Sequence, residues 1–589
     1  MRSHPLSVLK FGSSVLRSER DLPRVVSEIY RLIRDGERVV AVVSALGRTT
    51  EVLLDSARRL NAQPPPEALA SLLATGESKS AALLTVALGR AGIPCRLFSP
   101  GQLRLRHSGP LLDGEPTGLD RATLLAALRD VPVVVLPGFF GMSVDGRPGL
   151  LGRGGSDLTA LFLAHELSAD RCRLLKDVAG VFVSDPARAP TTPDRYRTLS
   201  FETAAKLGGV VVQKKAMRYA HRTRRSFEVA TPGDGFATRV GSLPDALEHS
   251  HQRGRPLRVA LLGLGTVGLG VYSHLRRWPE RFECVGVAVR DPARTRECEL
   301  PAGLLHESPW QVLSLDADVV VETIGGRDPA AELLRAALRQ GSHVVTANKT
   351  VVAEEGARLA ASAAARGVQF RFAAAVGGGV PVLEAVRRLA GQAPLRSISG
   401  VFNGTCNFVL DRMEEGASLA DAVRSAQALG LAEADPGDDL RGIDAARKLA
   451  VVCHEAFGVR LQPRDIPCRG IQDLEAAAIR EARAAGQTVR LIATCTRQGQ
   501  RLVADVRPRR LALTHPLAHC RDEDNRILIR PERGRSTVLS GKGAGRWPTS
   551  ESVLADLFDL ARLDTFAPGR KPRRRTSARS FDEVCNPAS

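Results

Sequence analysis

The chain has 589 residues, of which 43% are hydrophobic and 25% are charged, and its net charge is +19. This composition excludes a mainly disordered or fibrous protein, and the length allows about three to five domains. Apolar runs such as Val131–Met142 are interrupted by Pro and Gly before they reach the ~18 residues of a membrane helix. With no C-x-x-C pair among ten cysteines and no apolar leader, we expect a cytoplasmic protein with reduced thiols and no membrane partner.

The positive charge is spread along the chain and is concentrated only in residues 566–589. Aromatic residues make up 4% of the chain, which is too few for obvious base-stacking platforms. We therefore expect a disordered basic tail at 566–589 and no nucleic-acid partner. The alternative is a nucleic-acid-binding protein whose binding would depend on the tail and collapse with salt.

Lysine is scarce, because only ten of the 83 basic residues are Lys and the others are Arg. Since a guanidinium does not release its proton at working pH, a site that needs a compact, titratable ammonium requires Lys. The lysines are therefore candidate functional residues, although we expect about half of them to be chance survivors.

The first part of the chain, residues 1–248, alternates predicted strands and helices. Strands are expected at Leu6–Phe11, Arg38–Ser44, Pro132–Pro137 and Arg173–Lys176, and helices at Leu22–Asp35 and Asp157–Leu167. Such alternation predicts a layered α/β domain. The polar segment HSHQRGRP at 249–256 predicts a linker.

A second α/β pattern begins at Leu257. Strands are expected at Arg258–Leu262, Glu283–Val289, Ala317–Ile324, His343–Thr346 and Val368–Phe372. After Pro381 helices and strands are mixed, which predicts an α+β domain over 381–524. We expect residues 525–565, which contain the helical run Ser550–Leu563, to return to the domain formed by 257–380.

Gly263, Gly265 and Gly268 form G-x-G-x-x-G, with Thr266 and Val267 between the last two glycines. The motif follows a predicted strand and opens a predicted helix, which is the context of a dinucleotide-binding turn. The glycines allow the tight turn, the close approach of a pyrophosphate and the packing of helix on strand. The alternative is a glycine-rich packing turn.

The second predicted strand of this domain ends in Arg290-Asp291, about 20 residues after the glycines. Arg290 in this position suits the 2′-phosphate of NADP, whereas an acidic side chain there would accept from the ribose of NAD. Because the acidic Asp291 is adjacent, NAD remains an alternative coenzyme. An equal alternative for Arg290 is that it is a solvated loop residue.

Two lysines stand in dense polar segments of the second half. Lys349 follows a predicted strand at the sheet edge where α/β sites lie. Lys448 lies four residues after Asp444, so the two share one helix face, although a surface ion pair is the alternative. Upstream, the acidic cluster at 433–439 is either a solvated loop or a site for a substrate ammonium.

The segments GLGTVG, VVETIGG, TANK, AVGGGVP, NGTCNF, AEADPGDDLRGIDAARKL and GKGAGRWPTSESV occur in this order between Leu257 and Leu563. Together they resemble the homoserine dehydrogenase family. The resemblance implies NAD(P)H-dependent reduction of L-aspartate 4-semialdehyde to L-homoserine, a step of threonine and methionine biosynthesis. It also implies a homodimer or larger oligomer formed through the α+β domain.

The resemblance also implies roles for single residues. Asp444 and Lys448 would be catalytic, Lys349 would hold substrate and coenzyme and assist proton transfer, and Glu433 would bind the substrate amino group. Gly404, Thr405 and Asn407 would line the nicotinamide and substrate. A hydride that arrives at an aldehyde carbon leaves charge on oxygen, which a positioned ammonium can stabilise and protonate.

The family also suggests a monovalent cation, Na⁺ or K⁺. Its ligands here would be mostly backbone carbonyls around Val376, Gly378 and Val380. The acidic residue that the family often has before this segment is replaced by Ala373. We expect a weakened site.

Residues Val8 to Ala230 contain VLKFGSS, ATGES, LLGRGGSDLTALFLA and KDVAGVFVSDPAR, which resemble aspartate kinase, of the amino-acid kinase fold. The resemblance implies ATP- and Mg²⁺-dependent phosphorylation of L-aspartate. Phosphoryl transfer needs positive charge and backbone donors around the phosphates. The expected kinase-site residues are Lys10, Gly12, Ser13, Ser14, Glu77, Arg153, Gly154, Gly155, Ser156, Asp157, Asp177 and Asp185.

The kinase-like half departs from its family at three positions. Ser13 replaces a glycine, Lys176 stands where Thr is usual, and Val211 stands where a Lys is usual, although Lys214 and Lys215 are close by. The regulatory ACT domains have no room before Leu257. Two hypotheses follow, a bifunctional aspartate kinase–homoserine dehydrogenase and a homoserine dehydrogenase fused to a degenerate kinase-fold module.

The expected fold class is therefore α/β throughout. An amino-acid-kinase-like α/β/α domain would be followed by a Rossmann dinucleotide-binding domain at 257–380 and by the α+β catalytic and dimerisation domain.

Overall fold

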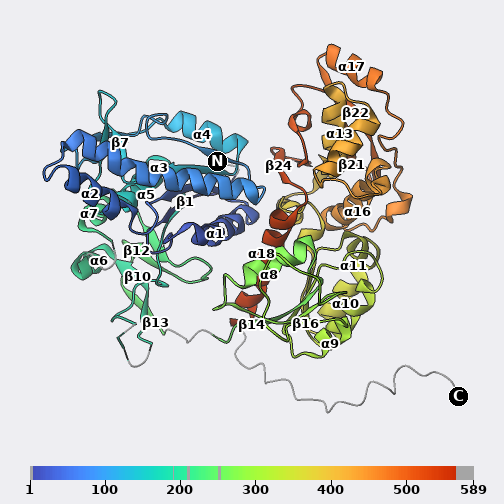
Figure 1. Ribbon diagram of the computed structural model, residues 1–589, viewed down its shortest axis with the longest axis horizontal. Helices are drawn as coiled ribbons and strands as arrows, with labels where there is room; N and C mark the ends of the chain where they lie inside the picture. The colour runs from blue at the N-terminus through green and yellow to red at the C-terminus, as the bar shows by residue number, and fades with distance from the viewer. Residues whose placement is uncertain (1–3, 187, 190–191, 209–211, 250–253, 566–589) are drawn as a thin grey trace.

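The computed structural model describes residues 4–186, 188–189, 192–208, 212–249 and 254–565 (Figure 1). The basic tail expected at 566–589 lies outside this part of the chain, as does half of the expected linker. The described residues form two α/β assemblies that lie side by side and a third, α+β unit built on the second of them. The expected fold class is confirmed for all three.

A nine-stranded sheet, ordered β13-β10-β12-β11-β9-β1-β2-β6-β3, forms the first assembly. Its strands are β1 (Leu6–Phe11), β2 (Arg38–Val43), β3 (Cys95–Leu97), β6 (Val133–Pro137), β9 (Arg171–Leu175), β10 (Arg195–Ser200), β11 (Phe227–Ala230), β12 (Ala237–Gly241) and β13 (Ala246–Glu248). The central strands β9, β1, β2 and β6 are parallel. They are almost wholly buried and apolar because helices cover both faces of the sheet.

The helices of this assembly include one element of unusual length, α3, with 25 residues. The helices are α1 (Leu22–Arg34), α2 (Thr49–Leu60), α3 (Pro66–Arg90), α4 (Arg121–Asp130), α5 (Gly155–Glu166), α6 (Phe201–Leu207) and α7 (Lys214–Arg222). A separate four-stranded sheet, β5-β4-β7-β8, contains β4 (Arg106–Ser108), β5 (Glu115–Gly118), β7 (Phe140–Met142) and β8 (Pro148–Leu150). Strands of three or four residues are too short for a periodic pattern, so the sequence did not predict this sheet.

The second assembly has a six-stranded parallel sheet, ordered β16-β15-β14-β17-β18-β19. Its strands are β14 (Leu257–Leu262), β15 (Phe282–Ala288), β16 (Leu305–His306), β17 (Val319–Glu322), β18 (His343–Thr346) and β19 (Phe370–Arg371), and its helices are α8 (Thr266–Leu275), α9 (Pro309–Ser314), α10 (Ala330–Arg339) and α11 (Lys349–Ala364). The strand order reverses between β14 and β17, which leaves a crevice at their carboxyl ends.

The α+β unit has a five-stranded antiparallel sheet, ordered β22-β21-β20-β23-β24. Its strands are β20 (Leu395–Val401), β21 (Gln487–Gln498), β22 (Arg501–Ala512), β23 (Asp524–Pro531) and β24 (Thr537–Lys542). Its helices are α12 (Val382–Gln392), α13 (Gly404–Glu414), α14 (Leu419–Ala428), α15 (Gly437–Leu440), α16 (Ile443–Phe457) and α17 (Ala476–Ala484).

The segment expected to return to the dinucleotide-binding domain, 525–565, divides between two units. Strands β23 and β24 stay in the five-stranded sheet, because β23 pairs along its length with β20. The last helix, α18 (Arg546–Thr565), packs on α8 of the second assembly. The expected boundary after residue 524 therefore falls inside β23, directly after the first residue of that strand.

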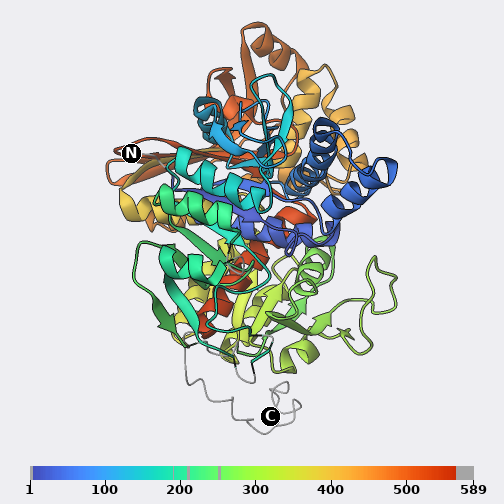
Figure 2. The same ribbon diagram turned by 90° about the vertical axis from the view of Figure 1, so that its left-hand side faces the viewer.

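Helix α18 also contacts α1 of the first assembly, so it lies between the two (Figures 1 and 2). Its Ala555 is 2% exposed and belongs to the apolar core of the first assembly, whereas Leu557 and Phe558 belong to the core around α8. At the same contact the Arg34 guanidinium pairs with Asp556 and, at 2.7 Å, with Glu384. The two assemblies therefore share a buried interface.

This interface also buries a carboxyl group, that of Glu551. The Ser27 hydroxyl of α1 lies 2.9 Å both from Pro23 O and from a Glu551 carboxyl oxygen, and its single proton can serve one of them. Burial raises the pKa of Glu551 to about 8 and lowers the pKa of His274, 3.4 Å away, to about 3. Near neutral pH the Glu551–His274 contact is therefore between two neutral groups.

The raised pKa of the buried Glu551 predicts that the free energy of unfolding depends on pH. Below pH 6.5 the unfolded His274 binds a proton that the native chain does not hold, which opposes the effect of Glu551. Between pH 6.5 and about 8 the native Glu551 holds a proton that the unfolded chain releases, so the free energy of unfolding falls as pH rises. We expect Glu551→Gln, which cannot ionise, to flatten this fall in denaturant titrations from pH 5 to pH 9. The exposed Glu202→Gln should keep the wild-type slope, and an unchanged slope in Glu551→Gln would contradict the prediction.

Candidate active sites

The glycine-rich turn connects β14 to α8 as the sequence predicted. Gly263 has φ +99°, in the region that favours glycine. A Cβ on Gly268 would lie 2.2 Å from Gly263 O, so only glycine allows helix and strand to approach this closely. Gly265, which precedes the first helical residue Thr266, faces open space. The backbone N–H groups at this helix start are therefore accessible to a pyrophosphate.

A cavity of about 680 Å³ opens at this turn. Besides the turn it is lined by four arginines, one of which, Arg546, pairs with an acid of the same lining, Glu297. The arginines are Arg290, Arg294, Arg296 and Arg546, and the acids are Asp291, Glu297 and Glu307. Asp291, which would accept from the ribose of NAD, uses one carboxylate oxygen to accept from Ala293 N at 2.9 Å. The cavity has the size and the polarity for a nucleotide, and its basic wall lies at the end of β15.

Asp444 is the centre of the second candidate site and is 1% exposed. Its Oδ2 lies 2.8 Å from the Lys448 ammonium, and its Oδ1 pairs with Lys349. Burial by itself favours the neutral acid, yet the two ammoniums hold the pKa of Asp444 well below its ordinary value. Burial also disfavours the charged Lys349, but the Asp444 carboxylate outweighs that effect and raises the pKa of Lys349.

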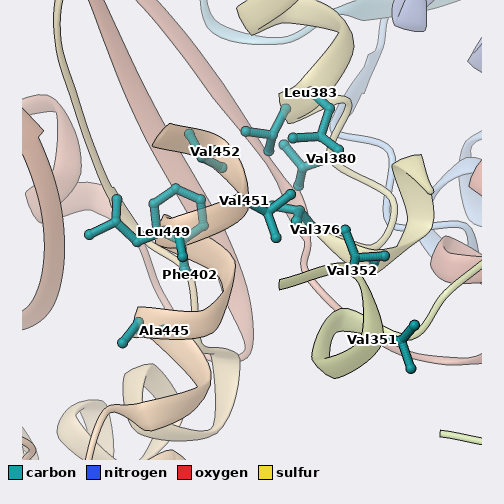
Figure 3. Packing of buried hydrophobic residues seen from close by; sticks show 14 of the residues in the cluster. Val351, Val352, Val376, Val380, Leu383, Phe402, Ala445, Leu449, Val451 and Val452 are labelled. Atoms are coloured by element: carbon teal, nitrogen blue, oxygen red, sulfur yellow. The ribbon is translucent and has the colours of Figure 1, made fainter. Parts of the chain in front are cut away.

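The two lysines reach Asp444 from different units. Lys448 follows Asp444 by one turn of α16, which begins after Gly442 in the left-handed conformation, φ +81°. Lys349 is the first residue of α11, and Asn348 caps this helix by accepting from Val351 N. Apolar residues of α11, α16 and the 376–380 segment belong to one buried core (Figure 3). This core fixes the distance between the two helices.

Two polar residues that the sequence analysis did not select complete this cluster. Asn403 donates from Nδ2 to Asp439 Oδ1 at 2.7 Å and to Asp444 Oδ2 at 2.8 Å, while its Oδ1 caps α13. Asn525 and Lys448 both donate to Phe402 O, at 3.3 and 2.8 Å. Asn403 could have been found from the sequence, because Asn directly before a helix start is a capping signal. Asn525 carries no such local signal.

Glu322 is a further buried carboxyl group that the sequence analysis missed. It accepts from Ile324 N at 2.8 Å, from Gly325 N at 3.0 Å and from the Thr346 hydroxyl. Burial raises its pKa. Because these bonds fix the turn after β17 and the end of β18, Glu322 sets the start of α11 and therefore the place of Lys349.

The expected substrate-lining residues take several positions. Gly404 is the first residue of α13, and a Cβ there would lie 2.5 Å from Glu523 O. Thr405 donates to Leu431 O at 2.8 Å, and Asn407 donates to Asp522 O at 2.8 Å. Glu433 is exposed in the turn before α15, where its backbone carbonyl accepts from Gln427. Its role toward a substrate ammonium stays a prediction.

In the first assembly, Asp157 repeats the arrangement of Asp444. It is 4% exposed, and its two oxygens lie 2.6 Å from the Lys10 ammonium and 3.6 Å from the Lys176 ammonium. Burial favours the neutral acid, but the two lysines outweigh it and hold the pKa of Asp157 below its ordinary value. Lys176, which departs from the family pattern, is therefore placed in the predicted site.

Around Asp157 the chain offers backbone donors and a second acid. Gly154 has φ +74° and precedes Gly155, the first residue of α5, and Asp157, which pairs with both lysines, lies in the first turn of this helix. Burial raises the pKa of Glu77 to about 7. The buried Ser156 follows Gly155, and Gly12 accepts from Val15 N and Leu16 N in the turn after β1.

The other expected kinase-site residues, Ser13, Ser14, Arg153, Asp177 and Asp185, have exposed side chains. Val211 lies outside the described residues. Lys215 does not reach Asp157, because its ammonium donates to Asp113 O, Gly114 O and Leu151 O at 2.7 to 3.2 Å. These bonds tie α7 to the four-stranded sheet and exclude Lys215 as the lysine that replaces Val211.

Within the described ranges there is no group of three or more His, Cys, Asp or Glu side chains that could hold a metal ion. The backbone of Val376, Gly378 and Val380 lies beside the 541–545 segment, since a Cβ on Gly378 would lie 2.5 Å from Gly543 O. None of the helices described is long and apolar enough to cross a membrane.

The family comparisons match three parts of the chain. A model described as homoserine dehydrogenase matches residues 381–558, one described as its NAD binding domain matches 263–373, and the amino acid kinase family matches 5–229. Both resemblances stated from the sequence are confirmed at this level, and the second assembly is a nicotinamide-coenzyme domain.

Known relatives cover the second half. Homoserine dehydrogenase of Corynebacterium glutamicum is 38% identical over 339 residues, 55% of this chain and 76% of the relative. That of Bacillus subtilis is 36% identical over 51% of this chain and 72% of its own length. A solved homoserine dehydrogenase from Thiobacillus denitrificans is 37% identical with a TM-score of 0.50, over 54% of this chain and 76% of that one.

The basic wall of the cavity predicts coenzyme preference. We expect Arg290→Ala to weaken NADPH binding at least about tenfold more than NADH binding, because only NADPH carries the 2′-phosphate that an Arg can hold bidentately. Fluorescence titration of each coenzyme measures the two dissociation constants. Exposed Arg58→Ala on α2 is the control, and equal losses for both coenzymes would make Arg290 an ordinary loop residue.

Proposed function

Since this chain belongs to the homoserine dehydrogenase family and carries an amino acid kinase domain, we propose a residue-level mechanism for each of its two activities. The observation that carries the proposal is shared by both sites. In each, one buried carboxylate binds two lysine ammoniums, and the net charge of this trio is positive. Each trio therefore presents positive charge to a substrate oxygen, and in the dehydrogenase this charge is opposed to the extent that Asp439, whose pKa is raised by burial, is ionised.

For the dehydrogenase we propose that Lys448 acts on the aldehyde oxygen of L-aspartate 4-semialdehyde. The nicotinamide, when bound in the cavity at Gly263–Gly268, supplies the hydride. Lys448 has three N–H groups, of which two are bonded to Asp444 and Phe402 O. The third is available to stabilise and then protonate the oxygen.

Lys349 has a different role in this proposal. Its side chain is 40% exposed, compared with 10% for Lys448, so it is accessible to solvent and substrate. We assign Lys349 to holding the substrate and returning a proton from solvent. Asp444 keeps both ammoniums in place, and Glu433 would bind the substrate amino group. The arginine-lined wall supports NADP as the preferred coenzyme.

For the kinase we propose ATP- and Mg²⁺-dependent phosphorylation of L-aspartate. Lys10 and Lys176 would neutralise charge on the transferred phosphoryl group, while backbone N–H groups at Gly155 bind phosphate oxygens. Arg153 is exposed and is free to clamp the substrate carboxylate. The alternative, a degenerate module, is not favoured by a chain that retains Lys10 and Asp157 and adds Lys176.

Three further properties belong to the proposal. A Na⁺ or K⁺ ion would bind backbone carbonyls around Val376, Gly378 and Val380. A homodimer would form through the five-stranded sheet, whose edge strand β22 has twelve residues. The protein would work in the cytoplasm on small-molecule substrates without nucleic acid.

Two assays on the full chain test the proposed function. NADPH oxidation that depends on L-aspartate 4-semialdehyde measures the dehydrogenase, and hydroxamate formed from ATP, L-aspartate and hydroxylamine measures the kinase. Both reactions are expected. Aldehyde reduction without any aspartyl phosphate would replace the bifunctional proposal by the degenerate module.

Lys448 gives the sharpest dehydrogenase prediction. We expect Lys448→Ala to lower kcat by about 10² or more, because general-acid help is typically worth that much, while coenzyme binding stays intact. Lys448→Arg should not restore activity, since a guanidinium does not readily release a proton. Steady-state kinetics with a coenzyme titration measure both effects, and a variant that keeps most of its turnover would refute the assignment.

Lys10 and Lys176 give the kinase prediction. Lys10→Ala and Lys176→Met should each lower the rate of aspartyl-phosphate formation by about 10² or more, because phosphoryl transfer depends on positive charge at the phosphates. Semialdehyde reduction should stay nearly unchanged, since the two sites lie in separate cores. The exposed Lys79→Met is the control. Full kinase activity in Lys176→Met would contradict the role of Lys176 and leave the neutralisation of phosphoryl charge to Lys10.

A further inference from the structure

A loop of the kinase domain lies directly against the dehydrogenase. Gly92 follows the end of α3, and its carbonyl accepts from Lys542 N at 3.3 Å. Gly92 has φ +73°, and a Cβ there would lie 2.6 Å from the Lys542 Cβ. From the other side, a Cβ on Gly541 would lie 2.7 Å from Gly92 O. The two backbones are therefore in close contact, with no room for a side chain.

Lys542 and Gly543 continue from this contact into the catalytic cluster. Lys542 O accepts from Gly379 N at 3.2 Å, and the Lys542 ammonium lies 2.7 Å from Glu523. Gly543 packs on the Asn525 amide, which a Cβ at 543 would overlap at 2.0 Å. Asn525 donates to Phe402 O, the carbonyl that also receives a bond from Lys448. Consecutive contacts thus run from Gly92 to the Lys448 ammonium.

A second contact ties the kinase domain to the same segment. The Arg34 guanidinium at the end of α1 is 6% exposed and pairs with Asp556, Glu384 and Asp559. Asp556 also accepts from Ala373 N at 3.3 Å, at the start of the 373–380 segment. Gly378 of that segment touches Gly543. Arg34 therefore fixes the 373–380 segment, Gly92 fixes residues 541–543, and these two segments contact each other.

We propose that Gly92 and Arg34 are positioning residues of the dehydrogenase, so that the kinase domain is part of the machinery that orients Lys448. This inference rests on the proposed role of Lys448. Neither residue lines the cavity at the glycine-rich turn, and both act through backbone segments that they fix. The buried ion pairs of Arg34 give this contact a defined geometry, because three carboxylates on three sides of one planar guanidinium leave it a single orientation.

The size of the expected effect follows from the demands of catalysis. A displacement of about 1 Å in a catalytic group can cost about 10² in rate. Gly92→Ala must move Lys542 or the 91–92 loop by several tenths of an ångström, because real Cβ atoms essentially never approach another atom within 3.0 Å. The displacement reaches Phe402 O and Lys448 through Asn525.

The test compares Gly92→Ala with Gly146→Ala in the full chain. Gly146 has φ +80°, similar to Gly92, but its Cβ would meet nothing within 4 Å, so it carries the backbone strain without the contact. We expect Gly92→Ala to lower kcat for L-aspartate 4-semialdehyde about tenfold or more, while KM for NADPH and the rate of aspartyl-phosphate formation stay within about twofold of the control.

Gly541→Ala presses on the same contact from the dehydrogenase side, and because Gly541 has φ +153° and pairs with Asn525 in the sheet, it also strains β24 itself. It should therefore lose at least as much kcat as Gly92→Ala, and the double variant should lose little more than Gly541→Ala alone. The reciprocal variant keeps the proposal testable if Gly92→Ala does not fold. Wild-type kcat in either variant would overturn the proposal, as would parallel loss of both activities with a lowered Tm. A wild-type chain that does not reduce the aldehyde would instead refute the proposed function.

Discussion

A buried carboxylate shared by two lysines is the interaction on which both sites depend. A carboxylate taken out of water is strongly destabilising unless opposite charge and hydrogen bonds replace the lost hydration. Asp444 and Asp157 each meet this requirement with two ammoniums, which leaves one positive charge in excess. The carboxylate also holds at close range two ammoniums that would otherwise repel each other. Four of the ten lysines of the chain are used in this way.

The excess charge explains why these positions hold lysine in a chain that otherwise uses arginine. A guanidinium would neutralise Asp444 as well, but it could not return a proton to an alkoxide, and its planar fork would occupy both carboxylate oxygens. The scarcity of lysine therefore pointed to Lys349 and Lys448 before any geometry was known. It pointed equally to Lys215, whose ammonium is enclosed by carbonyl oxygens and ties two elements together.

The parts of the fold that could be predicted from the sequence are those with a local signal. The glycine-rich turn, the buried parallel strands and the i,i+4 pair Asp444–Lys448 each depend on residues close together in the chain. The contact between Asn525 and Phe402 O joins residues more than 120 positions apart, and the carboxyl group of Glu551 meets Ser27 across 524 positions. Side chains that meet only after two domains dock leave no periodic pattern. The four-stranded sheet was missed because its strands are too short to show alternation.

The interface between the two assemblies rests on the same physics as the two sites. Arg34, Glu384 and Asp556 form a buried ionic cluster that is stable only when all its members are present, because removal of one partner leaves uncompensated charge. Around it, Arg24 lies 4.0 Å from the centre of the Trp278 ring and Arg31 lies 4.7 Å from that of Phe558. Arginine thus supplies both charge and flat stacking surface at the junction.

Helix α18 has a consequence for the order in which the chain can fold during synthesis. Among the helices described it is the last to be translated, yet its Ala555 fills part of the core formed by β1, β2 and α1, which lie near the start of the sequence. Until this helix has been translated, α1 lacks the apolar cover of Ala555 and the Arg34 guanidinium lacks the Asp556 carboxylate, although Glu384 is already available to it. Synthesis therefore leaves this part of the kinase domain uncovered until α18 has been made, and this one helix then completes both cores.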